Sequence, residues 1–134
     1  MHDMTRTVRL SKDGSIHVTD ERINTSSHLV AACFALCGTV LLVVQSALQH
    51  DAWKIVGFSV YGFSLLSLFI FSTLHHGLSG EKRASEVMRT FDYISVFLLI
   101  AGTVTPLVLV LYRDIFGWMV LSVVWIIAIL GIVL

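Results

Sequence analysis

Residues 29–48 read LVAACFALCGTVLLVVQSAL and contain no Asp, Glu, Lys or Arg. An α-helix rises about 1.5 Å per residue, so a run of this length crosses the hydrocarbon core of a bilayer, which is about 30 Å thick. Backbone N–H and C=O groups surrounded by lipid need partners within the same segment, and an isolated span finds them only as a helix. The run therefore predicts a membrane-spanning α-helix.

Three further apolar runs follow along the 134-residue chain. Hydrophobic residues make up 56% of the chain and charged residues 13%, a composition that excludes an ordinary soluble domain. We predict an all-α fold, a polytopic transmembrane helical bundle of about four spans. A tail at residues 1–27 precedes a transmembrane domain at 28–134, with spans near 28–48, 54–76, 92–112 and 115–134.

The basic residues are unevenly divided between the two sides that four spans define. Seven Lys and Arg residues lie in the tail and between the second and third spans, against two in the other connections. By the positive-inside rule, the tail and the loop at 77–90 are cytoplasmic in a multi-pass protein of the cell membrane. Basic and acidic residues number nine each, so net charge indicates no nucleic-acid partner, and the predicted partner is the lipid bilayer.

Three local signals refine this prediction. In the tail, alternating apolar residues on either side of Asp13 and Gly14 predict a small hairpin. Thr19 is placed as the N-cap of the helix that leads into the first span. Pro106 is the only proline of the chain and lies inside the third span, where it predicts a kink.

A row of polar residues precedes the first span. Glu21, Asn24 and His28 are spaced i, i+3, i+7, which places them on one face of a helix. Such a row lines a polar interior or, alternatively, caps and solvates the start of the helix. The spacing leaves both interpretations open.

A second polar group borders the cytoplasmic ends of spans two and three. Ser72 and His76 are one helical turn apart on the same face, whereas His75 points about 100° away. Imidazole is a common zinc ligand, and a nearby serine can hydrogen-bond a ligand or a bound water. The alternative is an interfacial histidine that other polar groups satisfy. Asp92 opens the third span, where a carboxylate either pairs with such a site or stays in the headgroup region.

Three motifs, in this order, carry a family resemblance. Residues 21–28, ERINTSSH, match E-x-x-N-x-x-[ST]-H, and residues 72–76, STLHH, match S-x-x-x-H. Asp92 and residues 100–106, IAGTVTP, match an aspartate that starts the third span and an I-A-G-x-x-T-P run. The ordered set resembles the bacterial hemolysin III family, which is grouped with the adiponectin and progestin receptors (PAQR) in a superfamily of membrane hydrolases.

The resemblance implies a seven-helix fold in a bacterial inner membrane with a cytoplasmic N-terminus, of which this chain covers the first four spans. It also implies a zinc ion near the cytoplasmic face, with His76 as one ligand and Ser72 and Asp92 beside it. The family's other two ligands come from an H-x-x-x-H in the seventh span, a motif that this sequence lacks. Because the chain stops inside an apolar run at Leu134, we expect it to be a fragment.

These features lead to three hypotheses. The first is a zinc-dependent membrane hydrolase of an amide such as a ceramide-like lipid, with Asp92 as base or water-orienting group and Ser72 as a hydrogen-bond donor. The second is a pore-forming, hemolytic protein that assembles through small residues such as Gly57, Gly62, Ser64 and Ser67. The third is a non-catalytic membrane subunit or sensor. A homo-oligomer could pool several copies of His76, but no residue pattern argues for one.

Overall fold

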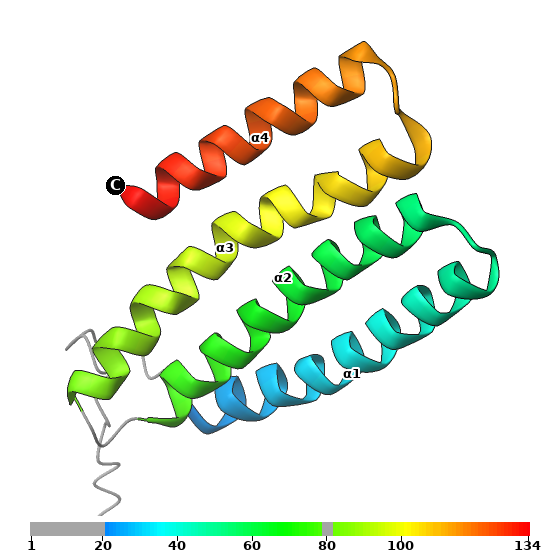
Figure 1. The fold of residues 1–134 in the computed structure, drawn as a ribbon. Helices are drawn as coiled ribbons and strands as arrows, with labels where there is room; N and C mark the ends of the chain where they lie inside the picture. Colours follow the sequence, from blue (N-terminus) through cyan, green and yellow to red (C-terminus); the bar gives the residue numbers. More distant parts are fainter. Residues whose placement is uncertain (1–20, 79–81) are drawn as a thin grey trace, which may run out of the picture.

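The computed structural model describes residues 21–78 and 82–134, and every regular element in these ranges is an α-helix. The helices are α1 (Glu21–Leu48), α2 (Ala52–Gly77), α3 (Lys82–Leu111) and α4 (Ile115–Val133), as Figure 1 shows. All four are long and apolar enough to cross a membrane. The predicted all-α fold of about four spans is therefore confirmed. The hairpin at Asp13 and the cap at Thr19 lie outside the described residues.

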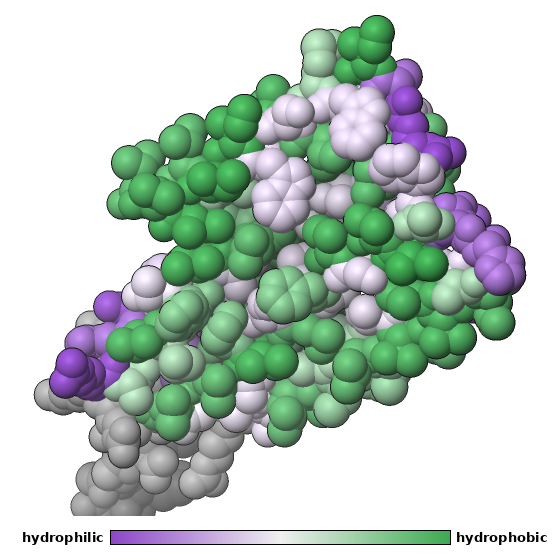
Figure 2. Space-filling model, in the orientation of Figure 1, coloured by the Kyte–Doolittle hydropathy of each residue, from purple (hydrophilic) through white to green (hydrophobic). Residues whose placement is uncertain are grey.

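The helices form an open row in which neighbours along the chain are neighbours in space (Figure 1). Within the described ranges α1 packs on α2, α2 on α3, and α3 on α4, while no other pair of helices packs together. Large apolar side chains cover most of the outer surface, and hydrophilic residues gather at the two ends of the helices (Figure 2). This distribution suits helices that are surrounded by lipid along their length.

Small residues let the neighbouring helices approach closely. A Cβ atom added to Gly57 on α2 would lie 2.9 Å from Cα of Pro106 on α3. Gly102 meets Ser64 in the same way between α3 and α2, and Gly62 on α2 meets Thr39 on α1. Lipid tails are as apolar as leucine, so membrane helices gain their association from such close packing.

This packing bears on the pore-forming hypothesis. Gly57, Gly62 and Ser64 are buried against other helices of the same chain. A homo-oligomer that used these three residues would first have to separate α2 from its neighbours. The oligomeric state itself stays a prediction.

The hydroxyl groups within the helices bond to the backbone of their own helix. Ser46 Oγ donates to the carbonyl oxygen of Leu42 at 2.6 Å, and Thr105 Oγ1 donates to that of Ala101 at 2.8 Å. Thr105 Oγ1 also accepts from Trp125 Nε1 at 3.2 Å, which joins α3 to α4. In α3 this bonding lies beside Pro106, and the helix continues through the proline to Leu111. Pro106 therefore does not end the helix.

The third helix starts earlier than the third apolar run. It begins at Lys82, so Asp92 lies inside α3 rather than at its start, and most of the predicted loop at 77–90 is helical. The charged residues of this segment interrupt the apolar pattern, but Lys, Arg, Ala, Glu and Met all favour a helix. Where the membrane boundary falls along α3 stays a prediction.

Candidate metal centre at the histidine end

Two histidines from different helices meet where α1 begins and α2 ends. The imidazole rings of His28 and His76 stack with their centroids 5.8 Å apart and their planes 17° apart. The ring of Phe69, almost two turns before His76 on α2, lies 5.9 Å from His28 at a tilt of 47°. We call this region, with the start of α3 beside it, the histidine end. Helical spacing predicted the helix face on which each histidine lies, but it did not predict that the rings of His28 and His76 stack.

His75 faces a different neighbour. Its Nδ1 atom lies 3.1 Å from the carbonyl oxygen of Ser85 near the start of α3. Its ring centroid is 5.1 Å from that of His76. The predicted divergence of the two adjacent histidines agrees with this arrangement, since His76 meets α1 while His75 meets α3.

The structure brings Ser72 and Asp92 to the same level along α2 and α3. The rings of Phe71 and Phe91, which precede these two residues in the sequence, stack at a centroid distance of 5.1 Å. Ser72 is 5% exposed, and Asp92 is partly buried. His76 is one helical turn beyond Ser72 towards the end of α2. The three predicted site residues thus share one end of the row.

The first motif is only partly described. His28 and Asn24 are both partly buried, and the backbone carbonyl of Asn24 accepts a hydrogen bond from Ser27 Oγ at 3.0 Å. Glu21 is the first residue of α1, and its side chain lies outside the described part. The contact of His28 with α2 favours the interior position for this residue over simple solvation of the helix start.

One polar atom of this end lacks a partner. Nδ1 of His28 is buried and has no hydrogen bond to any described residue. Buried polar atoms in native proteins nearly always have a partner, which is a protein group, a water molecule or a ligand.

The described residues do not bring together a full set of zinc ligands. A catalytic zinc ion takes three protein ligands and a water molecule. Over 21–78 and 82–134, no three His, Cys, Asp or Glu residues are placed to hold a metal ion together. His76 supplies one imidazole, and this part of the chain does not provide a full ligand set.

α4 does not cover the histidine end. A Cβ atom added to Gly131, in the last turn of α4, would clash with the ring of Phe97 on α3. Phe97 lies four turns into α3, so α4 ends well short of the level of His76 (Figure 1). Within the described residues, the histidine end consists of α1, α2 and α3.

Comparison with known proteins gives one consistent result. The family model described as "Haemolysin-III related" matches residues 16–134. Hemolysin-3 from Bacillus cereus is 34% identical over 116 residues, which are 87% of this chain and 52% of that protein. The Hemolysin-3 homolog from Bacillus subtilis (strain 168) is 32% identical over 116 residues, or 87% of this chain and 54% of that protein. The chain thus spans about half the length of these relatives. No solved structure matches.

Proposed function

This chain belongs to the hemolysin III family of membrane proteins, and on that basis we propose that its histidine end is one part of the centre of a zinc-dependent membrane hydrolase. The observation that carries the proposal is the placement of His76, Ser72 and Asp92 at one end of three packed helices. The substrate class is an amide bond of a membrane lipid. This end borders the apolar surface on which such a lipid would approach.

Each residue has a separate role in the proposal. His76 is one ligand of the metal, and the remaining ligands come from outside the described residues of this chain. When bound, zinc supplies a Lewis acid and a water molecule of lowered pKa. The Asp92 carboxylate would act as the general base, orienting a water molecule and accepting a proton from it, provided that it comes within hydrogen-bond reach of that water. The Ser72 hydroxyl donates a hydrogen bond to the substrate oxygen.

We also propose that the histidine end faces the cytoplasm. α1 begins at this end, so the tail that precedes it is on the same side of the membrane. The tail and the first parts of α1 and α3 hold seven of the nine Lys and Arg residues of the chain, which supports a cytoplasmic location in the cell membrane.

Metal analysis of the full-length protein, purified in detergent, tests the proposal. We expect one zinc ion per chain in the wild type and its loss in His76→Ala. The matched control is His50→Asn at the opposite end, because His50 has a φ of 52° and asparagine tolerates that backbone conformation. Wild-type protein without stoichiometric zinc, or His76→Ala protein that keeps it, would overturn the proposal.

A further inference from the structure

Two tryptophans and an arginine meet at the end of the row opposite to the histidines. Trp53 lies in the first turn of α2, Trp118 in the first turn of α4, and Arg113 in the connection between α3 and α4. The two indole rings form an edge-on contact with centroids 6.2 Å apart. The Arg113 guanidinium carbon lies 5.5 Å from the centre of the Trp53 ring. We call this cluster, with the adjoining connections, the tryptophan end.

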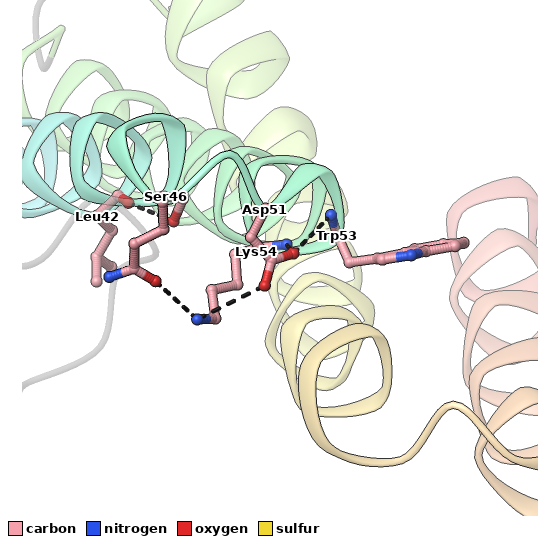
Figure 3. Close-up of polar contacts among 6 residues, drawn as sticks. Leu42, Ser46, Asp51, Trp53 and Lys54 are labelled. Carbon is pink, nitrogen blue, oxygen red and sulfur yellow. Dashed lines mark hydrogen bonds and ion pairs between the residues drawn. The ribbon is translucent and has the colours of Figure 1, made fainter.

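The cluster joins two helices that do not otherwise pack together. α2 and α4 both pack on α3, and their backbones make no close approach in the described ranges. Trp53 points away from Asp51 and Lys54 and towards α4 (Figure 3). The contacts of Trp53 with Trp118 and with Arg113 therefore bring the α3–α4 connection close to the start of α2, which is far from it in the sequence.

The acidic groups of this end are already engaged. Asp51 Oδ1 accepts from the backbone N–H groups of Trp53 and Lys54, both at 3.1 Å, and its Oδ2 lies 3.6 Å from Lys54 Nζ (Figure 3). Asp114 Oδ1 accepts from the backbone N–H of Gly117 at 2.7 Å. Each aspartate thus caps the helix that follows it. Neither carboxylate forms an ion pair with Arg113 in the structure as described.

Arg113 therefore presents an unused set of hydrogen-bond donors. Its guanidinium has five N–H groups and, among the described residues, only the face of Trp53 as a partner. The contact with the Trp53 ring orients the guanidinium plane and uses none of its N–H donors. A planar, fixed guanidinium matches two oxygens of a phosphate in a bidentate way.

The surroundings identify the source of such a phosphate. Arg113 lies two residues beyond the end of α3. Tyr112, just before it, is 59% exposed, and Phe116, three residues after it, is 68% exposed. Tryptophan and tyrosine at the ends of spanning helices lie at the level of the lipid headgroups. We propose that Arg113, Trp53 and Trp118 form a binding site for the phosphodiester headgroup of a membrane phospholipid. The phosphate lies on the guanidinium, and the glycerol and upper acyl chains lie along the indole rings.

Native mass spectrometry of the purified protein in detergent tests this site, with dioleoylphosphatidylglycerol as probe. We expect the wild type to retain a lipid adduct and Arg113→Gln to weaken retention about tenfold, the usual effect of losing one charge-assisted pair. Arg113→Lys keeps the positive charge but loses the planar pair of donors that binds a phosphate in a bidentate way. We therefore expect its lipid retention to lie between those of the wild type and Arg113→Gln. Arg89→Gln, which removes an exposed arginine of the histidine end, is the matched control and should leave retention unchanged.

Three results would overturn the proposal. They are equal retention by Arg113→Gln and wild type, equal retention of dioleoylglycerol, which lacks the phosphate, and displacement of the lipid by millimolar inorganic phosphate. Trp53→Leu gives an independent measure, because it removes the ring that directs Arg113 and leaves the charge; unchanged retention in this variant would also count against the site. Equal far-ultraviolet circular dichroism and melting temperature of the variants exclude misfolding as the cause of any loss.

Discussion

At the tryptophan end both aspartates accept hydrogen bonds from helix N–H groups, whereas at the histidine end the buried Nδ1 of His28 has no partner among the described residues. Lys54 at the former end donates to Gln49 and lies beside Asp51. At the latter end three imidazoles lie within ring contact of one another in a chain from α1 to α2. One end is organised to cap helices, and the other holds polar groups whose presence packing does not explain.

This difference concerns the stability of the folded protein, and the cost in stability lies at the histidine end. A buried polar atom without a partner costs about 1–3 kcal/mol, and such atoms persist where they serve function. Caps, in contrast, contribute to the stability of the helices that they begin. Under the function proposed above, the histidine end would carry the chemistry, and the tryptophan end would support the fold and contact lipid.

The largest expected effect comes from the close packing of α2 on α3, which aligns these two helices along their length. In Gly57→Ala, the new Cβ would lie 2.9 Å from the backbone of Pro106, which cannot move away as a flexible side chain can. We expect the free energy of unfolding, measured by SDS titration in mixed micelles, to fall by about 1–3 kcal/mol. The change would also shift Asp92 along the helix axis relative to Ser72. A substitution near the start of α2 would thus affect the histidine end.

Gly38→Ala is the matched control for that variant. Gly38 lies in the middle of α1, and a Cβ atom there would have no neighbour within 4 Å. Alanine should therefore stabilise the protein by about 0.5–1 kcal/mol through helix propensity alone. If both variants changed stability in the same direction, close packing between α2 and α3 would not be what distinguishes Gly57.

The apolar runs predicted the helices, but not how the helices are rotated against each other. Hydropathy identified all four spans because each uncharged run has the length of the hydrocarbon core. It placed the start of the third helix too late, since charge ends an apolar run without ending a helix. That Ser72 and Asp92 share one end of the row was within reach of sequence reasoning, because both residues border the connection between the second and third apolar runs.

The contacts between side chains of different helices were beyond that reasoning. Helical spacing fixes which face of α1 carries His28, but the pairing with His76 depends on the rotation of α1 against α2. The contact of Trp53 with Trp118 is harder still, because α2 and α4 are separated by a whole helix in the sequence. The small residues between the helices determine these rotations, and no single helix contains that information.

A smaller effect is expected from replacing the unpartnered histidine. His28→Phe keeps a ring of similar shape between His76 and Phe69 and removes the buried Nδ1. We expect the free energy of unfolding to rise by up to about 1 kcal/mol, because a buried polar atom without a partner among the described residues is lost. The proposed hydrolase function adds the expectation that turnover of an amide lipid decreases. Unchanged turnover together with unchanged stability would show that the two ends do not differ as argued above.

The smallest effect concerns the dependence of stability on pH at the tryptophan end. The backbone N–H of Lys54, followed by the Lys54 ammonium, holds the pKa of Asp51 below its ordinary value of 3.8, although desolvation opposes this shift. A carboxyl group whose pKa is lower in the folded state stabilises the protein fully above its unfolded pKa, and this contribution is lost as the pH falls through the folded pKa. The loss should therefore begin near pH 3.8 and continue below it.

Asn is also a good N-cap, so Asp51→Asn keeps the cap and removes only the titration. Melting temperatures of both proteins from pH 7 to pH 3 should converge at the acidic end, since all other carboxyl groups are common to the two. Curves that stay parallel throughout would show that the Asp51 carboxylate contributes nothing beyond what an uncharged cap provides.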